Sequence, residues 1–237
     1  MAIDERTHRS GRDRRFYTWV AIAIPLIILA GFARTYYLKG LFNGPALPGL
    51  VHLHGLVMTS WILLFIVQVR LVATRRLNVH RRLGIFGAVL AGLVIVVGVA
   101  TAISAAARGA SPGPPPLQFL VVPLGDMLVF AILIGTGLYL RKRMEIHRRL
   151  MLVGAVNLLT PAIARIPLQF IATGGPLVFF GLTDLCLLAC VAYDTIKNRR
   201  LHPVFIWSLL FIIASQPLRL ILAGTQAWLQ VATWLVR

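Results

Sequence analysis

The sequence predicts an all-α integral membrane protein, a polytopic bundle of about seven transmembrane helices with almost no mass outside the bilayer. Hydrophobic residues make up 58% of the 237 residues and charged residues only 13%, whereas a soluble domain carries about 25% charged residues. The apolar residues form long runs, and about 20 such residues are enough for a helix to cross the hydrocarbon core of a bilayer.

Seven apolar runs follow one another, separated by short polar connections. They lie near Phe16–Leu38, Leu50–Ala73, Leu83–Ala107, Leu117–Leu140, Arg148–Thr173, Pro176–Ile196 and Pro203–Trp234. The first run is too long for the apolar core of a signal peptide, so we expect residues 1–15 to be a basic cytoplasmic tail and residues 16–237 a single helical bundle. The last run is long enough to tilt or to end in an interfacial turn.

The positions of the basic residues predict the orientation. Most of the 24 Lys and Arg residues fall in the segments that lie on one side of the predicted bundle, residues 1–15, 74–82, 141–149 and 197–202. The positive-inside rule puts these segments and the N-terminus in the cytoplasm and the C-terminus outside. We therefore expect a multi-pass protein of the bacterial cytoplasmic (inner) membrane whose inner face contacts anionic headgroups. The net charge of +17 does not indicate a nucleic-acid partner, because no loop is long enough to form a basic domain.

A first group of candidate site residues falls in the outer half of the predicted bundle. Ionisable side chains at this depth are costly, and they usually pair with one another or line a polar cavity. His54 and Trp61 are two helical turns apart and so share one face of their helix. The candidate ligand-binding residues are His54, Trp61, Asp126, Arg165, Asp184, Gln216 and Arg219. In this hypothesis the arginines hold an anionic or carbonyl-bearing ligand; the alternative is a set of ion pairs that only join helices.

A second group lies at the inner face, in a weak internal repeat. The segment Arg75–Leu83 resembles the segment Arg141–Leu150, and Lys197–Pro203 is a looser third copy. These segments supply His80, His147 and His202, with Asp194 close to the last. Three imidazoles and a carboxylate are ligand types of zinc, and two of the imidazoles could bind a haem iron. The alternative is that the His-Arg-Arg units anchor the helix ends to anionic headgroups.

Several motifs support a resemblance to known membrane proteins. They are GFARTYYL (Gly31–Leu38), HLHGLVMTSWILLFIVQ (His52–Gln68), VHRRLG (Val79–Gly84), EIHRRLM (Glu145–Met151) and RLHP (Arg200–Pro203). Together they resemble an uncharacterised bacterial family of small multi-pass membrane proteins, a resemblance that implies no activity. The His-x-x-x-Gly at His80–Gly84 is more distantly similar to membrane proteins of the cytochrome b561 type, in which pairs of transmembrane histidines bind haem b. That resemblance implies haem b as the candidate cofactor, as one inner haem between His80 and His147, because the outer side offers His54 without an obvious second ligand.

The sequence leaves three classes of function open. It contains no Gly-x-Ser-x-Gly, Walker loop, His-Glu-x-x-His or Cys-x-x-Cys motif, which weakens nucleotide-driven and classical hydrolase functions. The first class is a haem- or quinone-binding membrane redox protein. The second is a carrier, channel or sensor that uses the outer charges, and the third is a non-catalytic subunit with membrane-protein partners. A metal-dependent membrane hydrolase built on the inner histidines is a further alternative.

Overall fold

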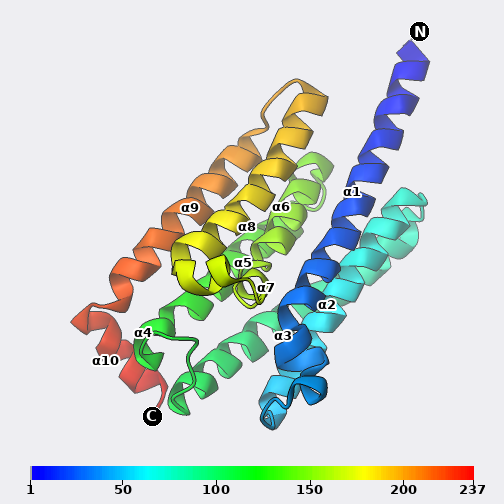
Figure 1. The fold of residues 1–237 in the computed structure, drawn as a ribbon. Helices are drawn as coiled ribbons and strands as arrows, with labels where there is room; N and C mark the ends of the chain where they lie inside the picture. Colours follow the sequence, from blue (N-terminus) through cyan, green and yellow to red (C-terminus); the bar gives the residue numbers. More distant parts are fainter. Residues whose placement is uncertain (1) are drawn as a thin grey trace.

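The computed structural model describes the backbone of residues 2–237 and the side chains of residues 15–237. Within this part of the chain every regular element is a helix, as the sequence predicts. Long helices run side by side; α1 begins at one end of the bundle and α10 lies at the other (Figure 1). The elements are α1 (Ala2–Phe32), the π-helical turn η1 (Ala33–Tyr37), the 3₁₀ turn η2 (Lys39–Phe42), α2 (Gly49–Ala73), α3 (Leu77–Ala107), α4 (Pro116–Phe119), α5 (Val121–Tyr139), α6 (Met144–Asn157), α7 (Thr160–Ile163), α8 (Gln169–Asn198), α9 (Pro203–Ala223) and α10 (Gln226–Leu235).

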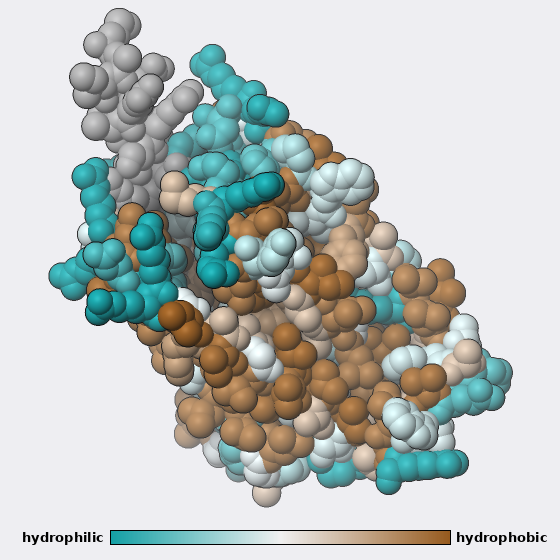
Figure 2. Space-filling view, turned by 180° about the vertical axis from the view of Figure 1, so that it is seen from behind, coloured by the Kyte–Doolittle hydropathy of each residue, from teal (hydrophilic) through white to brown (hydrophobic). Residues whose placement is uncertain are grey.

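Within the described part of the chain, six stretches are long and apolar enough, by length and composition, to cross a membrane. They are Arg15–Tyr37, Gly49–Ala73, Leu77–Ala107, Pro116–Tyr139, Gln169–Asn198 and Pro203–Ala223. The surface over the middle of the bundle is hydrophobic, and hydrophilic surface is most extensive at one end (Figure 2). These features are those of a multi-pass membrane protein.

The predicted fifth span does not form one continuous helix. α6 ends at Asn157, α7 is a single turn, and an irregular connection leads to α8. Pro161 and Pro167 explain the interruption, because proline lacks a backbone N–H and disfavours a helical conformation in the residue before it. The Thr160 hydroxyl donates a hydrogen bond to the Asn157 carbonyl oxygen (3.1 Å), which satisfies an acceptor at the break. Six long apolar helices and one broken segment therefore stand where seven continuous spans were predicted.

The boundary predicted between the fifth and sixth spans is a kink inside α8. Gly175 has φ 59° and ψ −152° and precedes Pro176. A positive φ of this kind suits glycine, which has no Cβ to clash with the backbone. The final run also divides, at Gly224 and Thr225, into α9 and α10. The Thr225 hydroxyl caps α10 by accepting a hydrogen bond from the Trp228 backbone N–H (3.2 Å).

The three basic connections lie together at the end of the bundle where α1 begins (Figure 1). They join α2 to α3, α5 to α6, and α8 to α9. We call this end the basic end, and the other the opposite end. α3 starts at Leu77, six residues before the predicted span. Its added first turns contain Arg81 and Arg82, whose side chains stay exposed.

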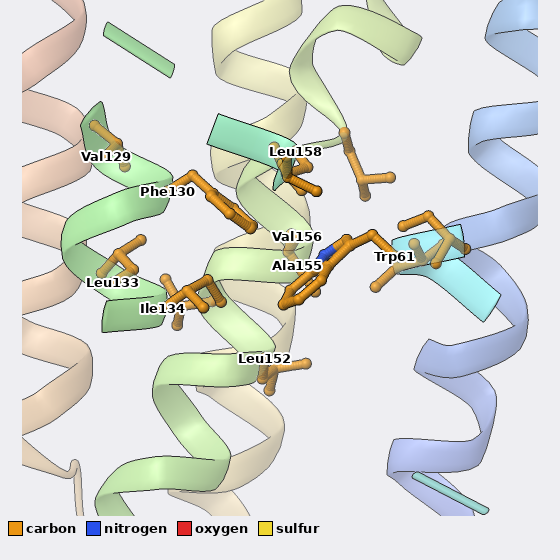
Figure 3. Packing of buried hydrophobic residues seen from close by; sticks show 14 of the residues in the cluster. Trp61, Val129, Phe130, Leu133, Ile134, Leu152, Ala155, Val156 and Leu158 are labelled. Carbon is orange, nitrogen blue, oxygen red and sulfur yellow. The ribbon is translucent and has the colours of Figure 1, made fainter. Parts of the chain in front are cut away.

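The core lies where α2, α5 and α6 meet. Trp61 of α2 points toward α5 and α6 (Figure 3), and its ring meets that of Phe130 edge-on, with centroids 5.2 Å apart. Gly154 allows α6 to approach α5, since a Cβ at this position would lie 2.6 Å from Ile134 Cδ1. The close packing of these helices holds the connection between α5 and α6, and with it the start of α6, in place at the basic end.

Candidate functional site

Two histidines from the internal repeat meet at the basic end. The backbone N–H of His80 bonds to the Arg76 carbonyl (3.1 Å), and that of His147 bonds to the Arg143 carbonyl (2.9 Å), so both histidines lie in the first turn of a helix. α3 and α6 each pack against α5. The repeated sequence therefore puts an imidazole at the start of each of the two helices that flank α5.

The two imidazole rings lie close together in an edge-to-face arrangement. Their centroids are 6.5 Å apart and their planes are inclined by 70°. His147 Nδ1 lies 2.8 Å from the Gly137 carbonyl oxygen. A carbonyl oxygen only accepts, so Nδ1 carries the proton and, in the neutral ring, Nε2 keeps its lone pair for a ligand. Metal-binding histidines typically donate their other ring N–H to a carbonyl or carboxylate in this way.

His80 has a ring nitrogen that is buried and unused. Its Nδ1 has no hydrogen-bond partner among the residues that the structure describes, although buried polar atoms usually have one. The main-chain carbonyl of His80 accepts a hydrogen bond from Gln68 Nε2 of α2 (3.4 Å). Beside it, a Cβ at Gly84 would meet only Gln68 Nε2 at 3.9 Å, whereas one at Gly87 would lie 3.2 Å from Leu64. The glycine face of α3 thus packs tightly on α2 at Gly87 and less tightly near His80.

The other two members of the inner group have different roles. His202 Nδ1 accepts a hydrogen bond from the Val204 backbone N–H (3.2 Å) and so caps α9. Asp194 receives two-pronged hydrogen bonds from Arg149, at 2.8 and 3.1 Å. The described residues include no group of three or more His, Cys, Asp or Glu that could hold a metal ion. The four-residue inner group that the sequence suggested for zinc is therefore not assembled in this part of the chain.

Arg149 is the residue at this end that sequence reasoning missed. Its side chain is almost fully buried and bonds to Glu145 Oε2 (2.6 Å) as well as to Asp194, and it lies over the ring of Phe205. Partial burial opposes ionisation of Glu145, but hydrogen bonds from Arg149 and the charge of Arg148 hold the pKa of that carboxyl below its ordinary value. A signal was present in the sequence, because Asp194 lies close to a basic segment and a carboxylate inside an apolar run needs a cationic partner.

The outer-half residues form two neighbouring pairs rather than one cluster. Arg219 of α9 forms a buried ion pair with Asp126 of α5 and also donates to Ser215 Oγ (2.8 Å). Gln216 Nε2 donates to Asp184 Oδ1 of α8 (2.8 Å). Gln216 and Arg219 are three residues apart on one helical face, so α9 presents a polar layer to both α5 and α8.

The remaining three residues lie elsewhere. Arg165 lies over the ring of Phe32, 5.0 Å from its centroid, and donates to the Pro161 carbonyl (2.7 Å). His54 lies on α2 beside Gly55, which packs on Tyr36 of η1, four residues after Phe32. Trp61 belongs to the hydrophobic core. The structure thus brings together four of the seven predicted residues in the polar layer, and His54 with Arg165 in a second location.

Comparisons of the chain with protein-family models, with curated proteins and with solved structures find no match. Any function must therefore be argued from the side chains and their geometry.

Proposed function

We propose that this chain is a membrane redox protein that binds one b-type haem between His80 and His147 at the basic end. The observation that carries the proposal is the 6.5 Å separation of the two ring centroids. An imidazole nitrogen binds a metal at about 2 Å, so two rings on opposite sides of one ion have centroids roughly 6 Å apart. Two histidine ligands would be enough to hold a haem iron, whereas a structural zinc ion takes about four protein ligands.

Several residues of the chain would each contribute to haem binding in a different way. The Gly137 carbonyl fixes the proton of His147 on Nδ1 and so directs Nε2 outward as a ligand. His80 retains ligating capacity because its buried Nδ1 has no partner within the described part of the chain. Arg81 and Arg82, next to His80 and exposed, are suited to pair with the propionate carboxylates. When bound, a haem supplies one-electron exchange between the ferric and ferrous states of its iron. The similarity of His80–Gly84 to cytochrome b561-type proteins supports the same cofactor.

The location follows from the charge distribution. We infer that the basic end faces the cytoplasm of a bacterial inner membrane, because Lys and Arg concentrate in cytoplasmic loops. In this orientation His80 and His147 would hold the haem near the cytoplasmic face, where it could supply one-electron exchange with a partner on that side.

The test is an absorption spectrum of the detergent-purified protein from haem-replete cells, before and after reduction. We expect a Soret band, and an α-band in the reduced protein. His80→Ala and His147→Ala should each abolish or shift the bands. His52→Ala is the matched control, because His52 is an exposed histidine at the opposite end. A colourless protein that also fails to take up added haemin would contradict the proposal and favour a non-catalytic membrane subunit.

A further inference from the structure

Two sequence motifs and the segment around Arg165 converge at the opposite end of the bundle, away from the paired histidines. α1 meets α7 at Gly31, where a Cβ would lie 2.1 Å from the Ala162 carbonyl oxygen. η1 meets α2 at Gly55, where a Cβ would lie 2.2 Å from the Tyr36 ring. The contact at Gly31 requires a glycine because its neighbour is backbone, whereas an added Cβ at Gly55 would displace the Tyr36 ring. The motifs GFARTYYL and HLHG and the segment around Arg165 thus form one packed unit.

The turn that leads out of α1 is fastened to α2 by tyrosines. The Tyr36 hydroxyl donates to the His52 carbonyl (3.3 Å), and the hydroxyls of Tyr37 and Thr59 are hydrogen-bonded at 3.0 Å. Both tyrosines belong to η1, a π-helical turn, and such turns occur frequently at functional sites. These hydrogen bonds fix the position of η1 relative to α2.

Arg165 carries a positive charge that no carboxylate among the described side chains compensates. Its guanidinium lies over the Phe32 ring and one amino group bonds to the Pro161 carbonyl, and this side chain is exposed. The four acidic residues with described side chains are all engaged elsewhere: Glu145 and Asp194 with Arg149, Asp126 with Arg219, and Asp184 with Gln216. The planar fork of the guanidinium therefore keeps donors for an outside anion.

His54 adds a second unsatisfied group beside this charge. It lies on the same face of α2 as the buried Trp61, so its ring points into the bundle rather than toward lipid. His54 Nδ1 is buried and has no hydrogen-bond partner among the residues with described side chains. Arg165 and His54 both border the turn that leads out of α1. Arg165 lies over Phe32, and Gly55, next to His54, packs on Tyr36. An arginine with donors left over and a histidine with an unpaired ring nitrogen, on different elements, suit a group with several acceptor oxygens.

We propose that Arg165 and His54 form a binding site for an oxyanion, a phosphate or carboxylate group, at the opposite end of the bundle. The guanidinium binds two oxygens of the anion while Phe32 supports its flat face, and His54 donates from the inner side. The same chemistry is present in a free anion and in the headgroup of an anionic lipid. This site shares no residue with the proposed haem site, and its readout is not a haem spectrum, so either proposal can fail alone.

The test measures thermal stabilisation of the full chain in two arms. In the first arm, inorganic phosphate or acetate is titrated into the detergent-purified protein. In the second, the protein is transferred to vesicles of phosphatidylcholine alone or with phosphatidylglycerol. A rise of Tm in the first arm identifies a free anion as the ligand. A rise confined to phosphatidylglycerol vesicles identifies a lipid headgroup.

Arg165→Gln and His54→Gln should each lower the affinity for the anion that raises Tm by about tenfold or more. The reason is that each removes a charge-assisted hydrogen bond. Arg165→Lys keeps the charge without the fork and should retain part of the effect, which also keeps the test valid if Arg165→Gln does not fold. The matched control is Arg108→Gln, an exposed arginine at the end of α3 whose guanidinium bonds to Ser104, and it should respond like the unaltered chain. If neither arm changes Tm, or if all Arg165 variants respond like Arg108→Gln, the site is overturned.

Discussion

The two copies of the His-Arg-Arg unit, at the starts of α3 and α6, have nearly the same sequence but different surroundings. Arg82 of the first copy is exposed, whereas Arg149 of the second is buried and bound to Asp194. The difference arises because α6 also packs against α8 and α9, so its second arginine meets a carboxylate from a neighbouring helix. The local sequence sets the helix start and the position of the histidine, and the neighbouring helices decide what each arginine does.

The largest expected loss of stability comes from replacing the buried arginine of the second copy. Arg149→Gln should lower the free energy of unfolding by about 3–5 kcal/mol, because it leaves the Asp194 carboxylate buried without its partner. The equivalent change in the first copy, Arg82→Gln, should stay within about 0.5 kcal/mol. Unfolding in mixed micelles, followed by helical circular dichroism, measures both. The double variant Arg149→Gln/Asp194→Asn should recover part of the loss, and equal losses for the two single variants would show that the copies do not differ as described.

A smaller loss of stability is expected from replacing the glycine near each histidine. These are Gly137, whose carbonyl bonds to His147, and Gly84, one turn after His80. Gly137 is buried against α6, where an added Cβ would lie 3.2 Å from Leu150 Cβ and 2.6 Å from the end of Met151. Met151 can turn aside but Leu150 Cβ cannot, so Gly137→Ala should destabilise the protein by about 1–2 kcal/mol through overpacking. Gly84→Ala meets only Gln68 at 3.9 Å and should be neutral or slightly stabilising, since alanine favours a helix. Thermal unfolding of the two variants side by side checks the order, and a greater loss for Gly84→Ala would reverse it.

The smallest effect concerns the looser third copy and its histidine. Burial, and then the charge of Arg149, lower the pKa of His202 below its ordinary value, and a protonated Nδ1 could no longer accept the hydrogen bond from Val204. A lowered pKa means that the unfolded chain binds the proton more readily. The contribution of His202 is therefore present above its unfolded pKa of about 6.5 and is lost as the pH falls through the lower folded pKa.

We expect this contribution to be about 0.5 kcal/mol or less, because the group is largely solvated. The measurement is the difference in Tm between the unaltered chain and His202→Gln across this pH range. The difference should shrink on acidification, and one that grew as the pH fell would contradict the assignment.

Much of the fold could be predicted from the sequence because apolar length is a direct consequence of bilayer thickness. α2 spans Gly49–Ala73, against a prediction of Leu50–Ala73. Prediction fell short at Pro161, where the fifth predicted span is interrupted, and at Gly175, where the predicted boundary between two spans is a kink within the single helix α8. Such breaks are stabilised by tertiary hydrogen bonds, such as that from Thr160 to Thr183 (3.1 Å), which no local pattern reveals.

The site residues were predictable by type and depth but not by partner. The rise per residue gives the depth of a side chain along its helix, so Asp126 and Arg219 could be expected at one level. It does not give the neighbours of each helix, and for this reason Arg165 was grouped with carboxylates that it does not meet. His80 and His147 were expected together because they share a repeated unit, whereas the partner of Asp194 depended on how α6 and α8 pack.

The most direct measurement is the haem-binding stoichiometry of the purified chain, determined by titrating haemin into the haem-free protein. If His80 and His147 are the two axial ligands, the titration should end at one haem per chain, and His80→Ala and His147→Ala should each remove the high-affinity end point. His202→Ala should leave it unchanged, because His202 caps α9 instead of facing the pair. An end point that is unaffected by either His80→Ala or His147→Ala, or no saturable binding at all, would contradict a haem site between these histidines.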